Sequence, residues 1–110
     1  MLNGEDAEII VLCYGITSRA AKAAIKLARK EGIKVGLLRL ITIWPFPEEL
    51  IRTLASTISA FIVVEINYGQ IVKEVERCAA GQAQVFLSSR LGGSIHNPIE
   101  ILDKIRKVNK

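Results

Sequence analysis

The chain has few of the residues that build metal centres and disulfide frameworks. Its 110 residues include one histidine, His96, and two cysteines, Cys13 and Cys78. Neither cysteine lies at a spacing typical of a metal site or a disulfide framework. A pair of histidines, or a histidine and a cysteine at ligand spacing, is excluded within the chain. We therefore predict no metal-binding residues and expect both thiols to be buried.

Other functional signatures are missing as well. No apolar run approaches the length of a membrane span, and the first residues lack a basic stretch followed by an apolar one, so we expect a cytoplasmic protein. Aromatic residues make up only 5% of the chain and offer no stacking platforms between basic residues, which disfavours nucleic-acid binding. Neither a GxGxxG sequence nor a Walker loop is present, so a self-contained dinucleotide or nucleoside triphosphate site is not supported.

Long apolar runs organise the chain. Half of the residues are hydrophobic and 24% are charged, and we predict one undivided domain over residues 1–110. Five of the six residues from Phe61 to Ile66 are apolar, and Glu8 to Tyr14 (EIIVLCY) is a second such run. Continuous apolar strands are typical of parallel sheets that helices cover on both faces, because a half-exposed strand would alternate polar and apolar residues.

Strand and helix patterns alternate four times along the chain. Strands are predicted over 8–14, 34–41, the start of 61–70 and 84–88, and helices over 19–31, 47–59, 69–80 and from Pro98 onward. The predicted buried stripe of the second helix consists of Leu50, Ile51, Leu54 and Ile58. The alternation predicts an α/β fold with three layers, α/β/α, around a mainly parallel sheet of about four to five strands.

For the strand order 2-1-3-4, the winding of the sheet reverses between the first and third strands. Ligands and partners of open α/β folds usually meet the sheet at such a reversal, at the carboxyl ends of the strands. The polar residues expected to gather there are Gly15, Thr17, Ser18, Glu65, Asn67 and Gln70.

The loop into the first helix offers two alternative functions. Thr17 and Ser18 can cap a helix, and with Arg19 they are candidates for binding an anion. Cys13 and Arg19 have the Cys-x5-Arg spacing of a phosphatase loop, in which a thiolate attacks phosphorus and an arginine holds the phosphate. Against a phosphatase-like or reductase-like enzyme, Cys13 ends an apolar strand, and Ala20 stands where such loops carry Ser or Thr. A packed thiol beside a helix cap is the other interpretation.

One side of the first helix is basic. Its cations are Arg19, Lys22, Lys26, Arg29 and Lys30. They could meet acidic substrates, coenzyme phosphates or an acidic electron carrier. A solvated outer face explains the same pattern, since such stripes change association rates more than they define sites.

The loop Thr42 to Pro47 (TIWPFP) carries the only tryptophan. If exposed, Trp44 and Phe46 form an apolar patch of the kind found at interfaces. If packed inward, the rings fasten the second helix to the sheet. The sequence leaves both alternatives open.

Further polar residues follow the predicted third and fourth strands. Glu65 could be a general acid or base if burial raised its pKa, or it could be a hydrogen-bonded group completed by Asn67 and Gln70. His96 is expected to be a structural hydrogen-bonding group, and an interface role remains open for it.

Three separated segments resemble a known family. They are Tyr14 to Arg19 (YGITSR) with Gly32 and Gly36, Leu40 to Pro47 (LITIWPFP), and Glu65 to Gln70 (EINYGQ) with Gly92, Gly93 and Pro98. Together they resemble the C-terminal domain of the alpha subunit of 2-oxoacid:ferredoxin oxidoreductases, above all the 2-oxoglutarate type. The resemblance covers residues 7–107.

The resemblance implies a transketolase C-terminal-like domain of an enzyme that decarboxylates a 2-oxoacid oxidatively, makes an acyl-CoA and reduces ferredoxin. The whole enzyme is implied to use thiamine diphosphate, magnesium, an iron–sulfur cluster and coenzyme A. In this family the thiamine and cluster chemistry lies in other domains and in the beta subunit, so we expect no bound cofactor and no catalytic residue in this domain, which alone should be inactive.

The resemblance also implies partners. They are the remaining alpha-subunit domains, the beta subunit and, through the complex, ferredoxin, while self-association stays open. The large N-terminal portion of the usual alpha subunit is missing, which implies a fragment or a separately encoded piece. The residues expected to contact neighbouring domains or subunits are Trp44, Phe46, Glu65, Asn67, Gln70 and His96.

Overall fold

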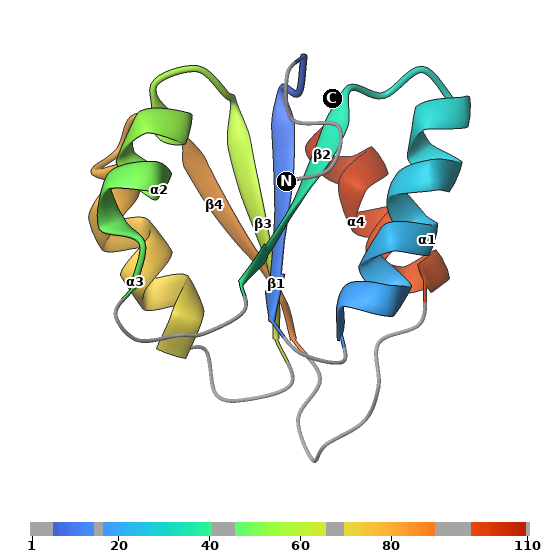
Figure 1. The fold of residues 1–110 in the computed structure, drawn as a ribbon. Helices are drawn as coiled ribbons and strands as arrows, with labels where there is room; N and C mark the ends of the chain where they lie inside the picture. The colour runs from blue at the N-terminus through green and yellow to red at the C-terminus, as the bar shows by residue number, and fades with distance from the viewer. Residues whose placement is uncertain (1–5, 15–16, 41–45, 66–69, 90–97, 110) are drawn as a thin grey trace.

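The computed structural model describes residues 6–14, 17–40, 46–65, 70–89 and 98–109. Strands and helices alternate through this part of the chain (Figure 1). The elements are β1 (Ile9–Tyr14), α1 (Thr17–Lys30), β2 (Val35–Leu40), α2 (Glu48–Ala55), β3 (Ala60–Glu65), α3 (Gln70–Ala79), β4 (Gln84–Ser89) and α4 (Pro98–Val108).

The described strands form one parallel sheet in the order β2-β1-β3-β4. The register pairs Ile9 of β1 with Val35 of β2 and with Ala60 of β3, and it pairs Ala60 with Gln84 of β4. The N-terminal strand β1 therefore lies inside the sheet rather than at its edge. The predicted parallel sheet and the predicted strand order are both confirmed.

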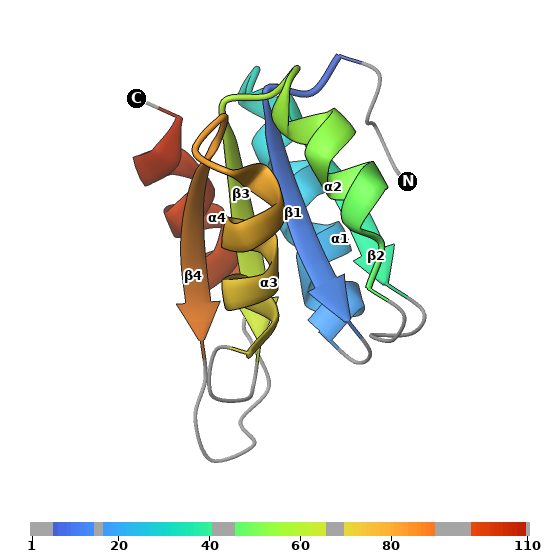
Figure 2. The same cartoon turned by 90° about the vertical axis from the view of Figure 1, so that its left-hand side faces the viewer.

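Helices cover both faces of the sheet, so that the fold has three layers. Figures 1 and 2 show α1 and α4 together on one face and α2 and α3 together on the other. Successive side chains of a strand point to opposite faces. Ile10 and Phe61 accordingly pack in the core under α2 and α3, whereas Val11 and Ile62 pack in the core under α1 and α4. All four of these side chains are fully buried, which explains the unbroken apolar runs.

The helix ends differ from the prediction by a few residues. The helix α1 begins at Thr17, so Thr17 and Ser18 are its first helical residues rather than residues that precede it. The helix α2 ends at Ala55 rather than near Ser59. Its end is closed by the hydroxyls of Ser56 and Thr57, which donate hydrogen bonds to the carbonyl oxygens of Thr53 and Leu54 at 2.7 and 3.1 Å.

The predicted buried stripe of α2 is wrong at one position. Ile51 is fully buried and Ile58 is 7% exposed, but Leu50 is 42% exposed. The buried face follows Ile51, Leu54, Ala55 and Ile58 at helical spacing, and Leu50 lies beside this face. Within the described residues, no helix has the length and apolar character needed to cross a membrane.

Candidate functional site

The carboxyl ends of the parallel strands share one edge of the sheet, which lies at the bottom of Figures 1 and 2, where the arrowheads point. The register places Cys13, next to the end of β1, beside Val64, next to the end of β3. The reversal of winding between these strands is therefore where the sequence predicted it. Glu65 is the last residue of β3, and Gln70 is the first residue of α3.

Several predicted site residues lie outside the described residues. They are Gly15, Trp44, Asn67 and His96. The backbone of Thr17, Ser18, Glu65 and Gln70 is described but their side chains are not. Their roles at an interface or an anion site stay predictions.

The structure separates the two parts of the proposed phosphatase loop. The side chain of Cys13 is fully buried in the core under α1 and α4, where it packs with alanines of α1 such as Ala20 and Ala24. Arg19 is exposed in the first turn of α1. A phosphate ester could not reach the thiol without opening the core, so Cys13 has the packed position that the alternative interpretation predicted.

Phe46 fastens α2 to the sheet. Its side chain is 8% exposed and belongs to the core that contains Leu40 and Ile51. The carbonyl oxygen of Phe46 accepts a hydrogen bond from the backbone N–H of Glu48 at 2.8 Å, next to the start of α2. Of the two alternatives for the aromatic loop, the structure favours the inward one for this ring.

Two exposed apolar side chains, which the sequence reasoning missed, lie near the end of β4 and at the start of α4. Leu87 in β4 is 37% exposed, and Ile99 in the first turn of α4 is 53% exposed. Phe86 is half-buried, with the Lys104 ammonium 5.7 Å from the centre of its ring. Phe86 and Leu87 are successive residues of β4, so they point to opposite faces of the sheet, and Phe86 packs against the core under α1 and α4. A signal was present, because β4 is the last strand of the sheet and Ile99 lies off the buried stripe of Ile101, Leu102 and Ile105.

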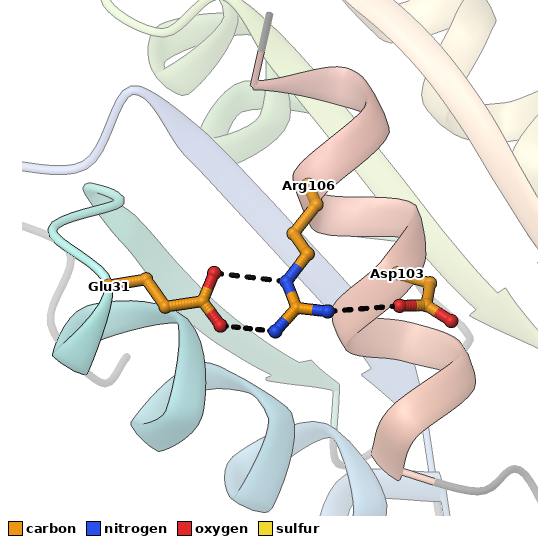
Figure 3. Close-up of polar contacts among 3 residues, drawn as sticks. All are labelled: Glu31, Asp103 and Arg106. Carbon is orange, nitrogen blue, oxygen red and sulfur yellow. Dashed lines mark hydrogen bonds and ion pairs between the residues drawn. The ribbon is translucent and has the colours of Figure 1, made fainter.

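Carboxylates and arginines form ion pairs away from this edge. In Figure 3, Arg106 of α4 holds the carboxylate of Glu31 through two nitrogens and also donates to Asp103 at 3.2 Å. Arg29 holds Asp6 through two nitrogens, at 2.8 and 3.0 Å. These pairs tie α1 to α4 and to the residues that precede β1.

A third cluster links the two helices on the other face. Arg77 of α3 donates to Glu48 of α2 at 2.6 Å and to Glu74 at 2.9 Å. The hydrogen bond from Arg77 lowers the pKa of Glu48, as those from Arg29 and Arg106 lower the pKa of Asp6 and Glu31. These carboxylates stay ionised at neutral pH, which suits an ion pair rather than a general acid.

The two thiols are placed apart. Cys78 packs in the core under α2 and α3, on the face of the sheet opposite to Cys13, and its burial raises the pKa of its thiol. The described residues contain no group of three or more His, Cys, Asp or Glu side chains that could hold a metal ion.

Comparison with known proteins places this chain among oxidoreductase subunits. The family model for the pyruvate:ferredoxin oxidoreductase core domain II matches residues 7–101. The 2-oxoglutarate synthase subunit KorA of Methanothermobacter thermautotrophicus is 47% identical over 106 residues, which cover 96% of this chain and 28% of that protein. The ketoisovalerate oxidoreductase subunit VorB of Methanothermobacter marburgensis is 49% identical over 104 residues, which cover 94% of this chain and 29% of that protein. The chain thus spans less than a third of the length of these relatives.

Two solved structures share the fold. The 2-oxoglutarate:ferredoxin oxidoreductase from Magnetococcus marinus matches with a TM-score of 0.77 at 19% identity, over 96% of this chain and 18% of that chain. A split-gene transketolase matches with a TM-score of 0.82 at 17% identity, over 98% of this chain and 40% of that chain. These matches confirm the predicted transketolase-type fold. With the family model matching nearly all of the helices and strands described above, the chain belongs to the pyruvate:ferredoxin oxidoreductase core domain II family.

Proposed function

We propose that this chain is a non-catalytic assembly domain of a 2-oxoacid:ferredoxin oxidoreductase. Such an enzyme decarboxylates a 2-oxoacid oxidatively, forms an acyl-CoA and passes the electrons to ferredoxin. The observation that carries the proposal is the family match over residues 7–101, together with 47% identity to a 2-oxoglutarate synthase subunit. We propose 2-oxoglutarate as the substrate of the whole enzyme.

The similarity to subunits of different substrate types supports a role outside the substrate site. Two KorA relatives are 47% and 48% identical to the chain, and two VorB relatives are 49% and 47% identical. A second carboxylate and a branched apolar group need different side chains for their recognition. The chain is about equally similar to KorA and VorB subunits. This similarity supports a structural role that both kinds of enzyme share, with the substrate selected elsewhere in the enzyme.

The donor set of the chain does not fit an iron–sulfur cluster. Clusters of the common types are held by four cysteine thiolates, and this chain has two cysteines. Cys13 and Cys78 also pack on opposite faces of the sheet, so they cannot join in one site. We therefore assign the cluster, together with thiamine diphosphate, magnesium and coenzyme A, to other parts of the enzyme.

We propose that the carboxyl edge of the sheet, together with the first turn of α4, faces the companion domains or subunits. Leu87, near the carboxyl end of β4, and Ile99, in the first turn of α4, are exposed apolar side chains that a companion surface could cover. They precede and follow the segment that carries His96, one of the predicted interface residues. Trp44, Glu65, Asn67 and Gln70 are the other residues of the proposed interface.

The test uses the enzyme assembled from this chain and its companion subunits in one expression host. Replacing Ile99 by Ser should lower the amount of companion subunit that co-purifies with the chain, and Trp44→Ser should do the same. Leu50→Ser is the matched control, because Leu50 is similarly exposed but lies on α2, on the other face of the sheet. It should leave co-purification unchanged.

The rate of 2-oxoglutarate-dependent ferredoxin reduction separates assembly from chemistry. A non-catalytic domain predicts that Ile99→Ser lowers total activity only as far as it lowers the amount of assembled complex. Loss of activity per assembled complex would contradict the non-catalytic role. Full assembly of both the Ile99 and the Trp44 variants would contradict the proposed interface.

A further inference from the structure

The positive charge of the chain is concentrated on one helix. The 14 residues of α1 include five of the 15 lysines and arginines and no acidic residue. The other 96 residues carry ten basic and eleven acidic residues, so without α1 the formal net charge of +4 would become −1. The charge is therefore a property of α1 rather than of the whole surface.

Four of the cations form a straight stripe on the outer side of α1. Arg19, Lys22, Lys26 and Lys30 are all exposed and follow one another at intervals of three or four residues. The opposite side of the helix packs against the sheet through Ala20, Ala21, Ala24, Ile25 and Ala28. At a rise of 1.5 Å per residue, the stripe is roughly 16 Å long. We call these four cations the α1 stripe.

Among the residues that the structure describes, no carboxylate pairs with this stripe. Arg29, which lies on the same helix beside the stripe, holds Asp6 and donates to the carbonyl oxygen of Val35 at 2.9 Å. Arg77 and Arg106 are likewise paired with carboxylates. In the part of the chain that the structure describes, none of the four stripe cations takes part in an ion pair.

The arrangement works against the stability of the helix. Lys22 and Lys26, and Lys26 and Lys30, are like charges at i,i+4 spacing, which destabilise a helix. Arg19 lies in the first turn, where the helix dipole disfavours a cation. In α4, by contrast, Glu100 precedes Lys104 at the favourable spacing. Lys30, in the last turn, suits the helix dipole. Helix stability does not explain the other three cations, so their clustering points to a role in binding.

We propose that the α1 stripe docks an acidic surface of a protein partner. An acidic protein supplies the complementary charge over the length of one helix face. A membrane fits less well, since the apolar side of α1 is buried against the sheet and Leu27, 37% exposed, is the only large apolar side chain that the helix exposes. Nucleic acid fits less well because α1 carries no aromatic side chain for stacking.

The test is an NMR titration of the full chain with poly-L-glutamate as the acidic probe. The proposal predicts that amide shifts move mainly in α1 and that binding weakens as salt is added. Lys26→Glu should weaken binding at low salt by at least about threefold, the effect of one or two exposed charge contacts. Lys73→Glu on α3 is the matched control, because it makes the same change of charge at an exposed helical position on the other face of the sheet.

The remaining outcomes overturn the proposal. Equal weakening by Lys26→Glu and Lys73→Glu would mean that net charge alone attracts the probe. Absence of shifts in α1 would mean that the stripe binds no acidic chain. Parallel titrations use duplex DNA and vesicles of phosphatidylserine and phosphatidylcholine, and tighter binding of either at the same salt concentration would assign the stripe to that class of partner instead.

Discussion

Among the described residues, Ala80 is the one residue other than glycine with a positive φ. It follows α3 with a φ of +50°, and Gly81 comes next with a φ of +81°. Left-handed backbone costs a residue with a Cβ about 1–2 kcal/mol, whereas glycine adopts it freely. The turn into β4 is therefore built from one residue that suits it and one that does not.

Substitutions at Ala80 and Gly81 should therefore change the free energy of unfolding in opposite directions. Ala80→Gly should raise the free energy of unfolding by about 0.5–1 kcal/mol, because relief of strain exceeds the added entropy of the unfolded chain. Gly81→Ala should lower it by about 1–2 kcal/mol through backbone strain alone, since a Cβ there would meet nothing within 4 Å. Urea unfolding of both variants checks the pair, and a destabilised Ala80→Gly protein would contradict the account.

Sequence patterns located buried residues better than exposed ones. The apolar runs of β1 and β3 indicated burial on both faces, and Ile10 and Phe61 are indeed fully buried. Leu50 was misassigned because helical periodicity shows an apolar side but not how much of that side a neighbouring layer covers. The inward position of Phe46 was undecided for the same reason, since only packing settles which way a loop aromatic points.

At the scale of elements, ion pairs between distant residues join the helices. Glu31 follows α1, and Arg106 lies in the last turn of α4, 75 residues away. No local pattern could have predicted this contact, because it exists only after the strand order brings α1 and α4 to one face. Local spacing in α4 accounts only for pairs within the helix, such as that of Arg106 with Asp103.

The pH dependence of this bridge follows from the direction of the pKa shift. Arg106 lowers the pKa of Glu31 below its ordinary value of 4.5. A carboxylate whose pKa is lower in the folded than in the unfolded state stabilises the fold at pH values above its unfolded-state pKa. This stabilisation is lost as the pH falls through its folded-state pKa. Glu31→Gln should therefore lower the urea midpoint slightly at neutral pH, and the difference from the unchanged protein should vanish in acid.

The matched control is Glu76→Gln, an exposed glutamate on α3. It should leave the neutral-pH midpoint unchanged. High salt should also shrink the effect of Glu31→Gln, because the pair is exposed to solvent. A Glu31→Gln effect that is the same at all pH values would mean that packing, rather than charge, links α1 to α4.

For the whole molecule, one sheet joins two cores. Ile10 and Ile62 are both fully buried but lie in different cores, under α2 and α3 and under α1 and α4 respectively. Each strand contributes to both cores, so neither helix layer has a sheet of its own. The two cores should therefore unfold together, in one cooperative transition.

This architecture predicts similar effects of Ile10→Ala and Ile62→Ala. Each should lower the free energy of unfolding by about 2–5 kcal/mol, the range for an isoleucine truncated in a packed core. Each variant should still unfold in one transition, with far-ultraviolet circular dichroism and tryptophan fluorescence changing together. Two separate transitions in either variant would show that the layers unfold independently.

The fold was more predictable than the candidate site. Strand order and layering follow from apolar runs and short connections, which are properties of neighbouring residues in the chain. The exposure of Leu87 and Ile99 depends on what remains uncovered after packing, which sequence patterns do not show. The predicted interface residues Trp44, Asn67 and His96 lie outside the described residues, so they stay predictions.

The inner position of β1 has a consequence for synthesis on the ribosome. Ile9 pairs with Ala60, so one edge of the first strand has no partner until some fifty further residues have been translated. Until then the nascent chain presents an apolar strand with an unpaired edge, a state prone to aggregation. Slow translation or chaperone supply, rather than the stability of the finished domain, would then limit its yield in cells.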